Sequence, residues 1–205
     1  MKTILSVVVL MLAVPCIGSN FKDPSPTALF VETEALVFVL QMDMAKVLND
    51  KSKDPEYNTA QLIQKMPNNK IQSFNIKIKA RGRTRRIQEI CEFPPLKINF
   101  EKESTNNTIF SGQDKIKMVT HCQAMETYQN FTNLEYLIYK AYNQLTTHSY
   151  RVRLVEVTYQ DTKQNYPDIV KTGFLIEDDD EMASRISGEI STKKYGALIV
   201  ATKSP

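Results

Sequence analysis

The stretch 74-FNIKIKARGRTRRIQEICEFPPLKINF-100 decides the fold, because it contains two strand patterns and the connection between them. Residues 74–80 alternate strictly between apolar and polar side chains, which is typical of a strand with one face in water. Residues 96–100 alternate again after two prolines. The connection holds four arginines within six residues, 81-RGRTRR-86. We therefore predict two neighbouring strands joined by a strongly basic loop.

The segments on either side extend this pair into an α+β domain. Further strands are predicted at 30–44, 115–120, 151–159 and 173–177, and residues 49–58 read as a polar loop. Between 127 and 145 the apolar spacing changes to three and four residues, which predicts an amphipathic helix; its apolar positions are Phe131, Leu134, Ile138, Tyr142 and Leu145. The expected fold is a twisted, mainly antiparallel sheet with one principal helix. From residue 74 the order is strand, strand, strand, helix, strand, strand.

The N-terminus has the pattern of an export signal. A lysine at position 2 precedes an apolar run of 14 residues, 4–17, and small residues follow at 18 and 19. The run is shorter than the roughly 20 residues that a membrane-spanning helix needs. We predict a signal peptide at 1–19 and a periplasmic or extracellular protein. A lipoprotein signal that uses Cys16 is the alternative.

The composition of the remaining chain limits its partners. Of 26 basic and 23 acidic residues, one lysine lies within 1–19, so the exported chain would carry 25 and 23, a formal charge of +2. Such a balance argues against non-specific nucleic-acid binding, which depends on a strong excess of Lys and Arg. We expect a linker at 20–29, one domain at 30–181 and a tail at 182–205.

Two cysteines remain after export, Cys91 and Cys122, and an oxidising compartment favours a disulfide between them. The loop closed would be about 30 residues, worth roughly 3 kcal/mol on the chain-entropy model. There are two alternatives. One is a metal site formed by Cys91, His121 and Cys122, and the other is a pair of buried free thiols. Adjacent ligands without a fourth partner fit zinc poorly.

Several short sequence segments, in the same order along the chain, resemble a bacterial group of exported proteins similar to the spore-coat protein H (CotH) kinase-like family. They are RGRTRR, CEFPPLKINF, GQDKIKMVTHC, SYRVRLVEVTY and GFLIEDDDEMA, and the resemblance covers roughly residues 35–190. It implies the small lobe of a protein kinase, in which the connection between the first two strands covers phosphate. The family's RG-x-x-R motif is matched here by Arg81, Gly82 and Arg85. A surface arginine cluster paired with nearby acids is the alternative.

A kinase-like small lobe also implies a lysine on its third strand, paired with a glutamate on the helix. Lys117 and Glu135 occupy these positions, and Lys115 shares the strand face of Lys117. A row of solvated lysines is the alternative. The acidic run at 178–181 reads as a hinge toward a second lobe, with a metal site as a weaker interpretation.

The resemblance places the family's catalytic and metal-binding aspartates beyond the hinge, where this sequence has only 28 residues after Glu177. We therefore expect a truncated or stand-alone small lobe that binds a nucleotide or phosphate weakly, with ATP and magnesium as the implied ligand, and performs no catalysis alone. A partner polypeptide that supplies the missing lobe is a third explanation. The competing function is a binding or structural module of the envelope, whose arginine loop meets an acidic protein or polymer.

Overall fold

The computed structural model describes residues 27–31, 33–66, 69–191 and 201–202. Its helices are α1 (Ala28–Val31), α2 (Met44–Leu48), α3 (Glu126–Leu145) and α4 (Asp179–Arg185), with short 3-10 turns η1 (Thr84–Arg86) and η2 (Lys102–Thr105). Its strands are β1 (Leu36–Met42), β2 (Asn58–Lys65), β3 (Ile71–Ala80), β4 (Leu96–Phe100), β5 (Lys115–Val119), β6 (Val152–Asp161), β7 (Ile169–Ile176), β8 (Gly188–Glu189) and β9 (Ala201–Thr202).

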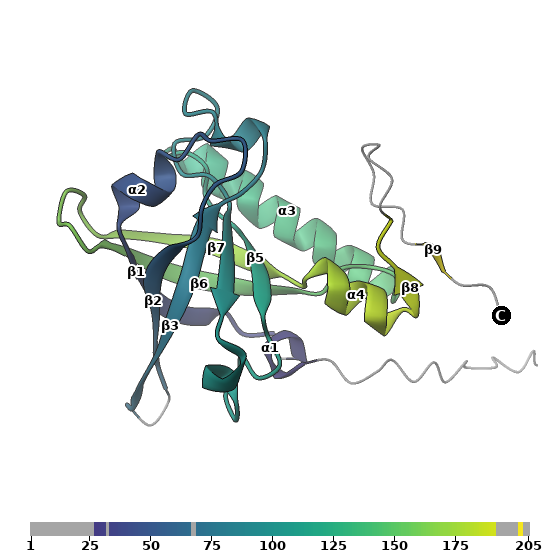
Figure 1. Ribbon diagram of the computed structural model, residues 1–205. Coiled ribbons are helices and arrows are strands. Elements are labelled where there is room, and N and C mark those ends of the chain that lie inside the picture. The colour runs from purple at the N-terminus through teal and green to yellow at the C-terminus, as the bar shows by residue number, and fades with distance from the viewer. Residues whose placement is uncertain (1–26, 32, 67–68, 192–200, 203–205) are drawn as a thin grey trace, which may run out of the picture.

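Seven strands form a closed barrel in the order β1-β2-β3-β4-β5-β7-β6 (Figure 1). Every neighbouring pair is antiparallel except β1 and β6, which run parallel and close the barrel over Leu36 to Met42. The predicted α+β class with one principal helix is confirmed. The sheet is mainly antiparallel, as predicted, but it closes into a barrel, because β1 and β2 connect the edge at β3 to the edge at β6.

Alternating strand residues fill the barrel. On β3 the predicted inner face is confirmed, since Phe74, Ile76, Ile78 and Ala80 are all buried. Phe74 meets Phe110 edge to face, with ring centroids 5.2 Å apart. An aromatic pair of this kind adds about 0.5–1.5 kcal/mol beyond its buried area. Phe74 and Phe110 belong to one buried apolar cluster to which all seven barrel strands contribute.

Helix α3 packs on the outside of the barrel against β7 and β6 (Figure 1). Tyr136 and Tyr139 lie on Phe174 of β7, at ring distances of 5.9 and 5.7 Å. Thr132 is buried and donates a hydrogen bond to the carbonyl of Thr120. The helix is confirmed, and the apolar positions that predicted it are all exposed: Phe131, Leu134, Ile138, Tyr142 and Leu145.

Several predicted boundaries change. The strand expected at 30–44 is divided among α1, β1 and α2, and strand β2 occupies a stretch in which no element was predicted. The end of the expected linker at 20–29 is helical in α1, whose Leu29 is fully buried. The acidic run at 178–181 is not an extended hinge, because Asp178 caps α4 and the next three residues form its first turn. The domain boundary expected at 181 thus falls inside a helix. The predicted signal peptide at 1–19 and Cys16 lie outside the described residues.

Candidate anion site at the arginine loop

The arginine loop, residues 81–86, leaves the barrel where β3 ends. The backbone N–H of Arg81 donates to the carbonyl of Pro95, so the strand pairing continues to the start of the loop. Gly82 then turns the chain with φ of +93°, a conformation that favours glycine. The side chain of Arg86 donates to the carbonyls of Gly82 and Ser52. Arg86 therefore holds the loop in place, while Arg83 and Arg85 are exposed.

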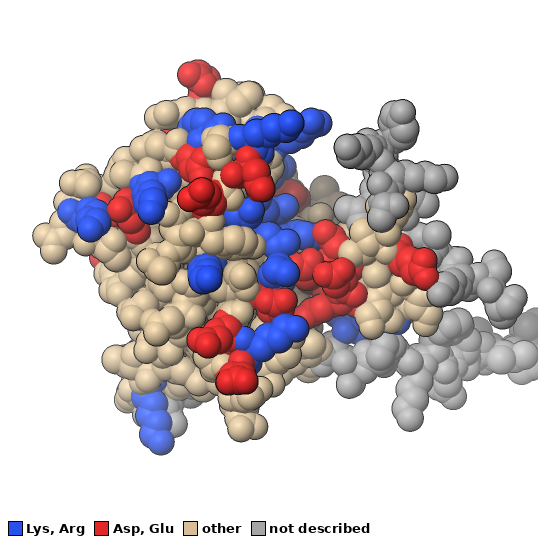
Figure 2. Space-filling view, viewed as in Figure 1, with Lys and Arg blue, Asp and Glu red and all other residues tan. Residues whose placement is uncertain are grey.

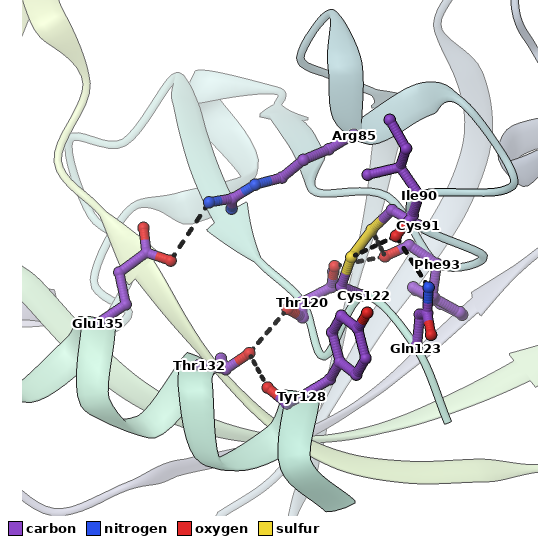
Figure 3. Close-up of a disulfide and its surroundings, with 10 residues drawn as sticks. All are labelled: Arg85, Ile90, Cys91, Phe93, Thr120, Cys122, Gln123, Tyr128, Thr132 and Glu135. Carbon is purple, nitrogen blue, oxygen red and sulfur yellow. Dashed lines mark hydrogen bonds and ion pairs between the residues drawn. A yellow bond between two sulfur atoms is a disulfide. The ribbon is translucent and has the colours of Figure 1, made fainter. Parts of the chain in front are cut away.

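A disulfide fastens the far end of this connection. Cys91 is bonded to Cys122, with the two Cα atoms 4.7 Å apart, which confirms the predicted pair (Figure 3). Phe93 donates its N–H to the carbonyl of Cys122, and Thr120 donates to the carbonyl of Phe93. Because Thr132 of α3 also donates a hydrogen bond to Thr120, the helix is linked to the segments that carry the disulfide.

The loop and α3 line an open pocket of about 450 Å³. The lining includes Arg81, Gly82, Arg85, Glu135, Tyr139 and Ile176. Figure 3 shows Arg85 reaching toward Glu135 of α3, and the closest nitrogen and oxygen are 3.6 Å apart. Four of the five residues predicted to bind phosphate thus line one pocket.

Positive charge in this pocket exceeds negative charge. The Nε of Arg81 is buried and has no hydrogen-bond partner among the described residues. Burial lowers the pKa of the Arg81 guanidinium, and the nearby charge of Arg85 lowers it further. Tyr139, Glu135 and Asp179 act in the opposite direction and raise this pKa. A buried donor without an acceptor costs about 1–3 kcal/mol, so an anion that accepted from Arg81 would remove an existing penalty.

Lys117 lies on the same outer face but has a different partner from the one predicted. It forms an ion pair with Asp179 at the start of α4, and its Nζ lies 4.9 Å from the ring centre of Tyr150. Tyr150 also donates to Asp179, over 2.7 Å. Burial raises the pKa of the Asp179 carboxyl, but the hydrogen bonds from Lys117 and Tyr150 outweigh it, so this pKa is lowered. The predicted pairing of Lys117 with Glu135 is therefore not seen, since each has another partner.

Three lysines form a row across adjacent strands, because Lys79, Lys97 and Lys117 are register partners on β3, β4 and β5. Each has an acidic partner: Asp54 at 3.2 Å, Asp178 at 3.5 Å and Asp179. Figure 2 shows acidic side chains gathered over α4 beside basic side chains on the barrel. The row is thus paired with carboxylates, unlike Arg81. Sequence reasoning interpreted Asp178 and Asp179 as part of a hinge and assigned Tyr150 no role, because the lysines that they meet lie 33 or more residues earlier in the chain.

Glu181, in the first turn of α4, is the carboxyl with the largest upward shift. Burial and the nearby acids Glu177 and Asp178 raise its pKa to about 7, against a hydrogen bond from Gln113 that lowers it. A raised folded-state pKa means that the protonated form stabilises the fold. That contribution is full below about pH 4.5 and is lost as the pH rises to about 7.

We therefore expect Glu181→Gln to flatten the pH dependence of stability between pH 4.5 and 7 and to raise Tm at pH 8 by about 2–4 °C. Thermal unfolding across this pH range measures the effect. Glu92→Gln makes the same chemical change at an exposed site and should leave the profile as in the unsubstituted protein. If Tm changed with pH in the same way in the unsubstituted protein and in both variants, Glu181 would not be the group with the raised pKa.

Other candidates do not form a site. His121 is buried beside Phe93, and burial, with a contribution from Lys171, lowers its pKa to about 4. In the described ranges, no three His, Cys, Asp or Glu side chains gather as a metal site would require. The same part of the chain holds no helix with the length and apolar character to cross a bilayer.

Comparisons with protein-family models, curated proteins and solved structures find no match to this chain.

Proposed function

We propose that the protein binds a phosphate-bearing anion in the pocket between the arginine loop and α3, with ATP–magnesium as the first ligand to test. The observation that supports this proposal is the unpartnered, buried Nε of Arg81 beside a second guanidinium, that of Arg85. The proposal is for binding and includes no chemical step.

The chemistry of the pocket suits phosphate oxygens. Guanidinium groups present several N–H donors in a planar fork that matches a phosphate, and each such charge-assisted hydrogen bond is stronger than a neutral one. The Arg85–Glu135 pair is long, at 3.6 Å, and both side chains are partly exposed. An ion pair of this kind contributes about 0–1 kcal/mol, so Arg85 can turn to a ligand at little cost.

The chain order also supports a finer description of the fold. From β3 onward the order is three strands, one long helix and two strands, as in a kinase small lobe. We propose that β3 to β7 and α3 form such a lobe, exported and similar to the spore-coat protein H family, and that β1 and β2 close it. Lys117 would then join the ligand only after it leaves Asp179.

Calorimetric titration of the purified protein with ATP–magnesium, and separately with tripolyphosphate, tests this proposal. We expect saturable binding that weakens by about 10- to 100-fold in Arg81→Gln, because a hydrogen bond to a charged group is worth about 1.5–3 kcal/mol. Lys65→Gln removes the same charge at the opposite end of the β2–β3 pair and should bind as the unsubstituted protein does.

Comparing the two ligands distinguishes a phosphate site from a nucleotide site. Equal affinity would identify phosphate as the recognised group, while tighter ATP binding that Lys117→Ala abolishes would favour a small-lobe nucleotide site. Absence of binding to both ligands would overturn the proposal. It would leave the envelope-interaction module as the better account of the arginine loop.

A further inference from the structure

The exposed face of α3 carries six large apolar side chains, which we call the α3 stripe. Each is between 55% and 80% exposed; the six are Phe131, Leu134, Leu137, Ile138, Tyr142 and Leu145. The helix meets the barrel through its other face, where Thr132, Tyr136 and Tyr139 pack (Figure 1). The stripe is therefore not needed to hold α3 on the barrel.

A cluster of this size is unusual on a lone monomer. If each side chain offers about 100 Å² of surface, the stripe presents roughly 600 Å², at the upper limit of apolar patches on monomers. Contact between two such faces would bury about 1,200 Å², the lower bound for specific and stable protein interfaces. The area is thus sufficient for a pair of copies.

The positions along the stripe are symmetric about Ile138. Leu134 and Tyr142 lie four residues before and after it, and Phe131 and Leu145 lie seven residues before and after it. A two-fold axis at Ile138, perpendicular to the helix, would place Leu134 opposite Tyr142 and Phe131 opposite Leu145. Ile138 would meet its own counterpart at the axis, so five of the six stripe side chains would meet an apolar stripe side chain of the other copy, with Leu137 beside the axis, as a self-complementary interface requires.

Charge on α3 is compatible with this pairing. The helix has three charged residues, Glu126, Glu135 and Lys140, and none belongs to the stripe. Glu135 is directed to Arg85 of its own chain. Because each barrel lies on the inner side of its α3, two copies can approach through their helices with the barrels outside.

We propose that the α3 stripe is a homodimer interface in which two copies of α3 pack antiparallel about Ile138. The packing resembles that of antiparallel helix pairs in bundles, with apolar residues at intervals of three and four. This inference does not depend on anion binding in the arginine-loop pocket.

Sedimentation velocity of the full chain, up to roughly 100 μM, tests the interface, since interfaces of this size can have micromolar dissociation constants. We expect a dimer for the unsubstituted protein and a monomer for Ile138→Glu, in which two carboxylates would face each other at the axis. Ile71→Glu changes a side chain that is 73% exposed on β3, outside the stripe, and should remain dimeric.

Mixing variants identifies the occupant as a second copy. Ile138→Glu and Ile138→Lys should each be monomeric alone, with a cooperative thermal transition that shows they are folded, and should form a heterodimer when mixed. A monomeric unsubstituted protein at all concentrations would overturn the proposal. So would a dimer that persists in Ile138→Glu, or a mixture that stays monomeric.

Discussion

Arg185→Met is expected to lower the free energy of unfolding by about 3–5 kcal/mol, the cost of leaving one member of a buried ion pair without its partner. Arg185 and Glu177 have side chains that are 6% and 4% exposed, and they form two contacts, of 3.0 and 2.9 Å. The same guanidinium donates to the carbonyls of Thr147 and Ser149. Arg185 therefore joins α4 to the end of β7 and to the loop before β6.

Chemical denaturation measures this effect, and two variants make it specific. Arg185→Met combined with Glu177→Gln should recover most of the loss, because it removes the buried charge but keeps an acceptor for the N–H of Arg151. Lys79→Met breaks an ion pair whose partner Asp54 is 92% exposed, and should cost less than about 1 kcal/mol. If Arg185→Met cost no more than Lys79→Met, α4 would not be an integral part of the domain.

The second large effect concerns the disulfide. Replacing Cys91 and Cys122 together by alanine should destabilise the protein by about 3 kcal/mol, since the bond closes a loop with a sequence separation of 31 residues. The corresponding fall in Tm is about 6–12 °C. Denaturation with and without reductant provides the measurement.

The same experiment has an internal control. Reductant should lower the Tm of the unsubstituted protein toward that of the double variant and should leave the variant unchanged. Free thiols that are alkylated rapidly in the unreduced, folded protein would contradict the bond. Because the bridge fixes the chain that follows the arginine loop, its loss should weaken the proposed anion binding more than Lys65→Gln does.

The strands found from the sequence are those whose pattern is local. On β3 and β4, apolar and polar residues alternate, and the structure follows them. Strand β2 gave no such signal, because its buried positions include Asn58 and Gln64. Polar residues on an inner face hide the period of two on which the prediction depends. The parallel pairing of β1 with β6, more than 100 residues apart, had no sequence signal.

Helix α3 shows a different limit. Its spacing predicted the helix correctly, but the face that packs on the barrel is the one with tyrosines and Thr132, while the aliphatic face is exposed. Periodicity shows that an apolar face exists and does not identify what covers it. The α3 stripe is exposed on this chain, and the proposed dimer would cover it.

In the candidate site, residues that are close in sequence could be predicted, and contacts between distant residues could not. Arg81, Gly82 and Arg85 are close in sequence and could be found as a motif. The partner of Lys117 could not, since Asp179 lies 62 residues away and reaches it through the turn into α4. Sequence reasoning placed Glu135 near the site correctly but assigned it to the lysine instead of Arg85.

The most direct test of the proposed anion site is the NMR signal of the Arg81 Nε–H group, followed as ATP–magnesium or tripolyphosphate is added. That group is buried and has no hydrogen-bond partner within the described residues. We predict a large, saturable change in its shift, with the same dissociation constant as the calorimetric titration, and little change for Arg86, which is bonded to backbone carbonyls. An Arg81 signal that stays constant at saturating ligand would contradict the assignment of the pocket as an anion site.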